Sequence, residues 1–402
     1  MRPADTSSRE ERDATAPAAG ILVRVDPPRG FRPFLIALGL LVVLDLLLRT
    51  PLYPSGFPED FRVPKDTLMA YEAFTSWAGG RGGLQVAVVG DSVIEGHLVP
   101  AAETLSARLD QRYEDAGRDV HVHNLGLRGA HAVDLLGQVA YLAERGRADL
   151  LLVQFDYIYY GDDEPVGVHY PELFALARDI APIDPAALPD AVRAELREKA
   201  AGASPAERAD DALGRVWRLW RERERIDAVL FGGRPSVAME TALRDRARAA
   251  LDEPGARQLR PDELDPDNLE RFFGGGRFGE ENPHLRYLEL ALAKAGHEGV
   301  PVVVFNNPLY FEGLAYHGAL DMEVYRANVT VVRELVESHG GTFVDLAEGF
   351  PQEMMLDTAH LLPEGHAEAA RRLEAAIEPL VTELDRERAG RRPAMPEGGE
   401  RR

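Results

Sequence analysis

The chain has 402 residues, of which 45% are hydrophobic and 28% are charged, so it can form a large domain with a buried core and is too polar to lie wholly within a membrane. Its formal net charge is −21, which argues against a nucleic-acid partner because binding to phosphates needs a basic surface. The chain has no cysteine, and this excludes disulfides, thiolate metal sites and a cysteine nucleophile.

The N-terminal part is predicted to hold a tail and one membrane helix. Residues 1–30 have no apolar period and are predicted to be disordered. Residues 31–49 are almost continuously apolar and approach the length of about 20 residues that crosses a bilayer. We therefore expect a transmembrane anchor there, followed by a linker and a helix over residues 50–83. Asp45 weakens this prediction, and a cleaved signal peptide or a buried helix of the soluble domain are the alternatives.

Arginines precede the apolar run, and positive charge tends to stay on the cytoplasmic side of a membrane. We therefore expect a single-pass membrane protein with a cytoplasmic N-terminus. The large domain is expected to be extracytoplasmic.

Residues 84–385 are predicted to form one α/β domain, because short apolar runs alternate there with helical periods. The alternation indicates a doubly wound parallel sheet of about five strands with helices on both faces. The predicted strands cover residues 84–89, 120–122, 150–155, 300–305 and 342–346.

Two segments depart from this alternation. Strand signals are missing at about residues 162–280, which are predicted to be a helical insertion packed over or beside the sheet. Its Trp217 and Trp220 could line a site, although their helical spacing is more typical of a core. Residues 386–402 are predicted to be an unstructured tail.

The first chemical motif is Gly90-Asp91-Ser92, which directly follows the first predicted strand. Glycine permits a tight turn from strand to helix, and the serine is then presented at the carboxyl edge of the sheet, where open α/β folds bind ligands. The Ser92 N–H points to the same edge, as an oxyanion donor must. Gly-Asp-Ser alone is a common turn, but its place after a buried strand favours a nucleophile.

The second motif is Asp357-Thr-Ala-His360, just before the last predicted helix. This spacing lets the carboxylate lie beside the imidazole, where it can set the tautomer and stabilise the imidazolium that forms when the histidine accepts a serine proton. Each residue alone could be a helix cap or a surface histidine. Because the motif follows the last strand, it predicts a triad of Ser92, His360 and Asp357.

Together these motifs resemble the SGNH (GDSL-like) hydrolase family. The likeness rests on GDSV at residues 90–93, DTAH at 357–360 and a middle block, HNLGLRGAH, at 123–131. It implies a flavodoxin-like sheet, serine esterase or acyltransferase activity and an oxyanion hole that uses the backbone N–H groups of Ser92 and Gly129. It implies no cofactor and no metal, and the sequence shows no P-loop and no HExxH motif.

One block of the family pattern is missing. The family has Gly-x-Asn-Asp after its third strand, whereas this chain has VQFDYIYYGDD at residues 153–163, without asparagine. Candidate replacements are Tyr157 and Tyr159 in the same loop, and Asn306 or Asn307 at the end of the next strand. We predict Asn307, because the proline after it would hold the backbone still. The alternative is that both asparagines satisfy turn backbone groups.

Residues beside these blocks are predicted to contact the substrate. They are Asp91, Tyr157, Asn306 and Tyr310.

Within the family, the C-terminal part is similar to membrane-anchored acyl-transfer relatives. Examples are the D-alanine-transfer protein of teichoic-acid operons and the alginate O-acetylation proteins. The likeness rests on VVVFNNPLYFEGLAYHG, VYRANV, GGTFVDLAEGF and DTAHLLPEGH. It implies a cell-envelope protein that acts on an acyl ester or acylated glycan, with a membrane-bound acyltransferase as a partner.

The residues do not separate an esterase from an acyltransferase. A non-catalytic envelope scaffold that binds a glycan or an acyltransferase is the alternative function. The missing asparagine supports the scaffold, and the complete triad opposes it.

Overall fold

The computed structural model describes residues 31–48, 82–145, 148–161, 167–171, 190–200 and 281–391, together with Tyr71 and short stretches or single positions between 173 and 279. The predictions for the N-terminal tail, for nearly all of the linker, for most of the helical insertion and for residues 392–402 lie outside the described residues.

A five-stranded parallel sheet forms the centre of the domain, in the order β2-β1-β3-β4-β5. The strands are β1 Leu84–Val89, β2 Val120–Asn124, β3 Leu150–Phe155, β4 Val302–Asn306 and β5 Thr342–Val344. The predicted parallel sheet is therefore confirmed. The chain leaves β1 toward β2 and returns to β3 on the other side, so the topological switch point, where such sheets bind ligands, lies between β1 and β3.

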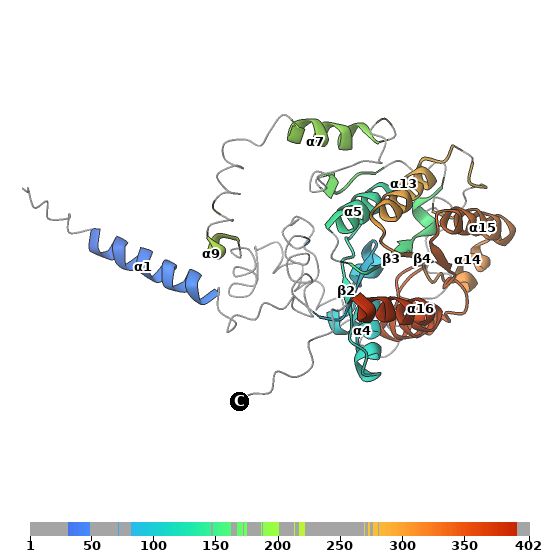
Figure 1. Cartoon of the computed structure of the whole chain (residues 1–402). Coiled ribbons are helices and arrows are strands. Elements are labelled where there is room, and N and C mark those ends of the chain that lie inside the picture. The colour runs from blue at the N-terminus through green and yellow to red at the C-terminus, as the bar shows by residue number, and fades with distance from the viewer. Residues whose placement is uncertain are drawn as a thin grey trace, which may run out of the picture.

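Helices cover both faces of the sheet (Figure 1). On one face α5 and α13 lie side by side, and α4 and α16 cover the other face. The main helices of the domain are α4 Leu105–Asp115, α5 Ala132–Arg145, α13 Pro283–Glu298, α15 Met322–Ser338 and α16 Pro363–Arg391. The shorter or outlying helices are α1 Phe31–Leu48, α3 Ser92–Glu95, α7 Asp190–Ala200, α9 Arg218–Arg221 and α14 Phe311–His317.

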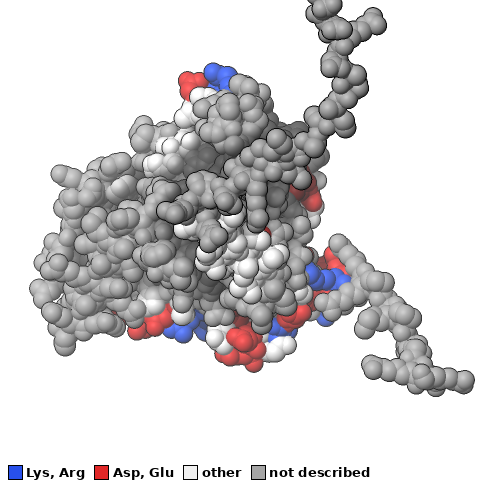
Figure 2. Space-filling model, turned by 90° about the vertical axis from the view of Figure 1, so that its left-hand side faces the viewer, with Lys and Arg blue, Asp and Glu red and all other residues white. Residues whose placement is uncertain are grey.

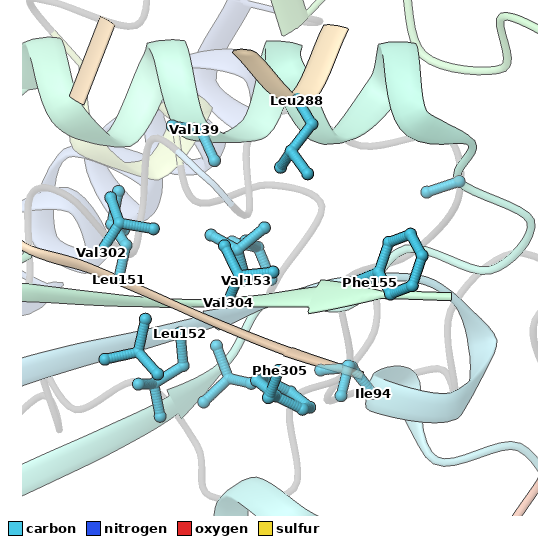
Figure 3. Close-up of a cluster of buried hydrophobic side chains, with 14 of the residues drawn as sticks. Ile94, Val139, Leu151, Leu152, Val153, Phe155, Leu288, Val302, Val304 and Phe305 are labelled. Atoms are coloured by element: carbon cyan, nitrogen blue, oxygen red, sulfur yellow. The ribbon is translucent and has the colours of Figure 1, made fainter. Parts of the chain in front are cut away.

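The core consists of two layers, one on each side of the sheet. Figure 3 shows Val153 and Phe155 of β3 pointing to the side of Val139 in α5 and Leu288 in α13, whereas Leu152 points the other way. This is the two-residue alternation of a strand. All these side chains are buried, which explains why β3 reads as a continuous apolar run.

The last helix is longer than predicted. α16 continues to Arg391, past the position 386 at which an unstructured tail is predicted. Ion pairs hold this end in place, because Arg118 Nη2 lies 2.6 Å from Asp385 Oδ2 and Arg388 pairs with Asp149. Figure 2 shows one face on which the described basic and acidic side chains lie beside one another in small mixed groups.

The apolar run before the domain forms α1, and its single carboxylate is paired within the chain. Asp45 is 7% exposed and accepts a hydrogen bond from the Leu219 N–H of α9 at 2.7 Å. Over the residues that the structure describes, no helix combines the length and hydropathy of a membrane span.

Candidate active site

The turn after β1 is built around a glycine that no other residue can replace without a shift. A Cβ atom at Gly90 would lie 2.0 Å from Gln154 Oε1 and 2.5 Å from Ile94 Cγ1. The close approach places the end of β1 against the end of β3 and lets the chain pass directly into α3. Ser92 is the first residue of that helix.

Asp91 has a structural position in this turn. Its Oδ1 accepts hydrogen bonds from the Val93 N–H and from Gln154 Nε2, both at 2.8 Å, and its own N–H donates to Gln154 Oε1 at 2.7 Å. The side chain is buried. Asp91 is predicted to bind substrate; in the structure its carboxylate caps α3 and joins β1 to β3.

The loop before α16 forms a second tight turn. Leu356 and His360 are joined by a backbone hydrogen bond of 2.8 Å, and Met355 pairs with Leu361 in an antiparallel bridge. Inside this turn Asp357 Oδ1 accepts from the Ala359 N–H at 2.9 Å and from the His360 N–H at 2.8 Å. The carboxylate is thus fixed beside the imidazole of its own turn.

The two turns meet at the carboxyl edge of the sheet. Ser92 Oγ lies 2.9 Å from His360 Nε2, and His360 Nδ1 lies 2.7 Å from Asp357 Oδ2. The structure thus brings the predicted triad residues together from opposite ends of the domain. Because Asp357 accepts the proton on Nδ1, Nε2 is left with the lone pair that faces the serine hydroxyl.

The charges of this pair favour an ionised carboxylate and a basic imidazole. Burial alone would raise the pKa of Asp357, but the hydrogen bond and the charge of His360 outweigh it and lower the pKa to about 2. Burial likewise lowers the pKa of His360, while Asp357, and more weakly Asp91 and Glu95, raise it above its ordinary value of 6.5. An imidazole of this kind is a stronger base toward a serine proton.

The middle block lies against α3. Asn124 Nδ2 donates to the Ile94 carbonyl oxygen at 2.6 Å, and Asn124 Oδ1 accepts from the Gly126 N–H at 3.0 Å. A Cβ at Gly126 would lie 2.4 Å from the Glu95 nitrogen, so only glycine allows this approach. The block is thereby held beside the turn that carries Ser92.

The backbone N–H groups of Ser92 and Gly129 are the two predicted oxyanion donors. Gly129 has a φ of 69°, in the left-handed region that favours glycine. Among the contacts of the described residues, neither the Ser92 N–H nor the Gly129 N–H donates a hydrogen bond. His169 Nδ1 is in hydrogen-bonding contact with the Gly129 carbonyl oxygen, which fixes the peptide plane that follows this glycine.

A buried carboxylate ties the Gly129 loop to the segment around residue 169. Asp134 accepts from the N–H groups of His131 at 3.0 Å, His169 at 3.0 Å and Tyr170 at 2.8 Å. Burial raises its pKa to about 6, although these three donors oppose the shift. Asp134 therefore holds the middle block, residues 123–131, against the segment around residue 169.

Tyr157 does not face the site. Its ring packs against Phe278 and Tyr325, and its hydroxyl accepts a hydrogen bond from Asn328 Nδ2 at 2.9 Å. Tyr157 is predicted to contact substrate and is a candidate oxyanion donor; in the structure its ring and hydroxyl are engaged with Phe278, Tyr325 and Asn328. Tyr159 instead stacks on His131, with 4.4 Å between ring centroids.

Asn306 also belongs to the fold. Its Nδ2 donates to Asp345 Oδ1 at 2.8 Å and to the Tyr325 hydroxyl at 3.1 Å, and its Oδ1 accepts from the Leu346 N–H at 2.6 Å. The amide is buried and engaged on both sides. Asn306 is predicted to bind substrate; in the structure its amide joins β4 to the segment after β5.

Tyr310 is buried as well. Its hydroxyl donates to Gln352 Oε1 at 3.1 Å, and its N–H donates to the Thr358 carbonyl oxygen at 3.0 Å. Tyr310 is predicted to contact substrate; in the structure it is 1% exposed. Tyr310 supports the Asp357 turn through its backbone.

Asn307 differs from its neighbour. Its N–H donates to the Phe155 carbonyl oxygen at 3.2 Å, which places it beside the end of β3. The side chain is 1% exposed, and among the described residues neither its Nδ2 nor its Oδ1 has a hydrogen-bond partner. A buried amide without partners is uncommon and calls for an explanation.

Other residues at the site are not anticipated from the motifs. The His97 ring lies 5.3 Å from the His360 ring, and the next residue, Leu98, has a φ of 59°, a left-handed conformation that is uncommon for leucine. Gln154 could have been found from the sequence, because it is a polar residue near the end of an otherwise apolar strand. His97 and Leu98 could not, because their positions depend on the tertiary turn. Over the described residues, no group of three or more potential metal ligands comes together.

Comparisons with known proteins give only distant likenesses. No protein-family model matches the chain, and no curated protein matches it. The structure of TesA aligns with 74% of this chain and 99% of its own, at 13% identity and a TM-score of 0.33.

Two further structures align at similar levels. LAE5, an α/β hydrolase from the metagenome of Lake Arreo in Spain, covers 73% of this chain and 95% of its own, at 13% identity and a TM-score of 0.35. A carbohydrate esterase of family 3 from Talaromyces cellulolyticus covers 75% and 99%, at 10% identity and a TM-score of 0.33. At these values the likenesses assign neither an activity nor a substrate to the chain.

Proposed function

We propose that the chain is a serine-dependent acyl-ester hydrolase or O-acyltransferase of the SGNH type. The observation that carries this proposal is the continuous hydrogen-bond path from Ser92 Oγ through the His360 imidazole to Asp357 Oδ2. A serine hydroxyl is a weak nucleophile unless a base removes its proton, and this path supplies the base and the group that orients it.

In the first half of the reaction Ser92 becomes acylated. Its Oγ attacks the ester carbonyl carbon while its proton passes to His360 Nε2, and Asp357 stabilises the imidazolium that forms. The N–H groups of Ser92 and Gly129 donate to the carbonyl oxygen as it becomes negative. The tetrahedral intermediate then releases the alcohol, which takes the proton from Nε2.

In the second half the acyl group leaves Ser92. A hydroxyl group gives its proton to His360 Nε2 and attacks the acyl carbon, after which Ser92 Oγ leaves and recovers the proton. Water as the acceptor gives an esterase, and a sugar hydroxyl gives a transferase. We propose an acylated envelope glycan or a related acyl ester as the substrate, with a membrane-bound acyltransferase as partner, on the resemblance of the C-terminal motifs alone.

Hydrolysis of 4-nitrophenyl acetate by the purified full chain tests the proposal. Release of 4-nitrophenolate above the rate in buffer supports it. The second candidate, a non-catalytic scaffold, is favoured by the lack of an asparagine in the loop after β3. No release, combined with binding of an acylated glycan, would support the scaffold.

For the third oxyanion donor we propose Asn307. It follows the strand next to β3, its amide has no hydrogen-bond partner among the described residues, and an amide N–H donates without titrating. The Tyr157 hydroxyl, which accepts from Asn328, is engaged elsewhere. An unpaired buried amide is destabilising by about 1–3 kcal/mol, so a role in catalysis would explain why it is kept.

Asn307→Ala is expected to lower kcat for 4-nitrophenyl acetate by about a hundredfold, as removal of one oxyanion donor does in general. The melting temperature should not fall, because the side-chain amide has no hydrogen bond among the described residues to lose, and removal of an unpaired buried amide offsets the lost packing. Asn328→Ala is the matched control, since Asn328 is equally buried but bonded to Tyr157 and Gly276. It should lower stability and leave kcat nearly unchanged. Unaltered kcat in Asn307→Ala would contradict the proposed role.

We further propose that residues 31–49 anchor the chain in a membrane, with the domain on the extracytoplasmic side. The apolar run supports this proposal. The hydrogen bond from the Leu219 N–H to Asp45 supports it as well, because the carboxylate of the helix then has a partner. Large apolar side chains of α1 are exposed along its length: Leu35, Ile36, Leu38, Leu40, Leu41, Val42, Val43, Leu44, Leu46 and Leu47.

Fractionation of cells that express the chain tests this placement. The full-length chain should stay with membranes after a high-salt wash, because apolar burial is insensitive to salt screening. A protease added outside the inner membrane should digest the domain. Protection in intact cells and digestion after lysis would reverse the orientation, and a shortened soluble protein would indicate a cleaved signal peptide.

A further inference from the structure

A second pair of carboxyl groups lies beneath the nucleophile turn. Asp91 precedes Ser92, and Asp156 directly follows β3. Both side chains are 3% exposed, and the Asp156 carboxyl lies within hydrogen-bonding reach of the Asp91 carboxyl. Because β1 and β3 are neighbours in the sheet, their ends bring these residues together although they are far apart in sequence.

Among the described residues, one oxygen of the Asp91 carboxylate receives no hydrogen bond. Its Oδ1 accepts from the Val93 N–H and from Gln154 Nε2. Its Oδ2 is buried, and among the described residues no N–H or hydroxyl group donates to it. Asp156 Oδ1 accepts from the Ile158 N–H at 3.4 Å, so Asp156 already has its own weak donor.

Two ionised carboxylates in contact and out of water repel each other strongly, and such pairs hold one proton between them. The buried Oδ2 of Asp91 needs a donor, and an Asp156 O–H group would supply it. Burial and the neighbouring Asp91 raise the pKa of Asp156 well above its ordinary value, which is the direction that favours a proton on Asp156.

We propose that Asp156 is a neutral carboxylic acid that donates a hydrogen bond to Asp91 and so positions the turn that carries Ser92. It is a positioning residue, since it acts through Asp91 and not on the substrate. With this bond, both oxygens of Asp91 are held: one by α3 and Gln154, the other by the loop after β3. The inference rests on the proposed function only where activity is the readout.

Other titratable groups surround the pair. Asp357 faces Asp156, and its negative charge favours the protonated acid. Burial raises the pKa of the Tyr160 phenol, and the negative charge of Asp91 acts in the same direction. The Asp91 charge also acts on His360 and His131, where it opposes the lowering of the pKa by burial. The negative neighbours act in the direction that keeps the proton on Asp156.

The sign of the pH dependence follows from this state. Asp156 binds its proton more tightly in the folded protein than in the unfolded chain, so its contribution to stability is lost as pH rises through its folded pKa. The turn that carries Ser92 should become less ordered in the same pH range. Acid pH does not remove this contribution, which distinguishes it from the Asp357–His360 pair.

The decisive experiment compares Asp156→Asn and Asp156→Ala with the wild type in the full chain. Asparagine keeps an N–H donor toward Asp91 and cannot lose a proton. Asp156→Asn should keep kcat for 4-nitrophenyl acetate within about threefold and lack the alkaline fall of the wild-type profile. Asp156→Ala should lower kcat by about tenfold or more, as the loss of a donor to a buried charged group does. Asp149→Asn, at the opposite end of β3, is the matched control and should keep the wild-type profile.

Infrared spectroscopy gives a readout that needs no enzymatic activity. A protonated-carboxyl C=O band should be present at mildly alkaline pH and should disappear as pH rises further, and it should be absent from Asp156→Asn. No such band in the wild type, or the same alkaline fall of kcat in Asp156→Asn and the wild type, would overturn the proposal. An inactive wild type that shows the band would count against the proposed function alone.

Discussion

Replacing Ser92 by alanine is expected to lower kcat for a small ester by about 10⁴- to 10⁶-fold, because the covalent route needs this hydroxyl. The fold should remain intact, since among the described residues the side chain makes a single hydrogen bond, to His360 Nε2, and such a bond contributes only about 1 kcal/mol. Steady-state turnover and thermal unfolding of the same preparation measure both effects.

His360→Ala should lower kcat to the same level, and the double variant should be no slower than either single one, because nucleophile and base act as a unit. Ser338→Ala and His339→Ala are matched controls on the far end of α15 and should retain wild-type turnover. Comparable turnover in Ser92→Ala and the wild type would remove Ser92 from the mechanism.

Asp357→Asn is expected to lower kcat by about 10⁴-fold while the fold is kept. The asparagine has nearly the same shape, but its amide favours the wrong tautomer of the imidazole and cannot stabilise the imidazolium. The backbone N–H groups of Ala359 and His360 can still donate to the side-chain oxygen, as they do to Oδ1 of the aspartate. A loss of less than about tenfold would show that Asp357 does not orient the base.

The same variant should shift the acid limb of the pH profile. Burial lowers the pKa of His360 and the Asp357 charge raises it above 6.5, so wild-type kcat/KM should rise with pH as His360 loses its proton, with a midpoint above 6.5. Without the carboxylate, burial prevails and the midpoint of the residual activity should move to lower pH. A midpoint that does not move would show that Asp357 does not interact with His360 in solution.

Much of the fold could be predicted because its strands are buried on both faces. β1 and β3 have the predicted bounds, since Leu84–Val89 and Leu150–Phe155 are apolar runs that end at polar or glycine residues. β4 and β5 are shorter than predicted, beginning at Val302 and ending at Val344. Their flanking apolar residues pack in loops, and periodicity does not separate such residues from strand.

The triad could be predicted because its residues lie in short turns next to strands. Gly90 and Ser92 need only the end of β1, and Asp357 and His360 need only their own turn. Parallel strands end at one edge of the sheet. This rule alone predicts that two motifs far apart in the sequence lie close together, because each of them follows a strand of the sheet.

The surroundings of the triad could not be predicted because they depend on side-chain direction. Tyr157 and Tyr159 stand two apart in one loop, but the first turns to Asn328 and the second to His131. Asn306 and Asn307 are adjacent, but among the described residues only the Asn306 side chain is hydrogen-bonded, to Asp345 among others. Neighbouring residues at a strand end point to opposite faces, and the motif alone does not say which face holds the site.

The most direct measurement of the central claim is covalent labelling of the purified full chain with a fluorophosphonate, followed by mass spectrometry of its peptides. Only a serine activated by a base should react. We expect one phosphonylated residue, Ser92, with labelling lost in His360→Ala and unchanged in His339→Ala. Labelling of another serine, or of Ser92 at the same rate in His360→Ala, would contradict the triad of Ser92, His360 and Asp357.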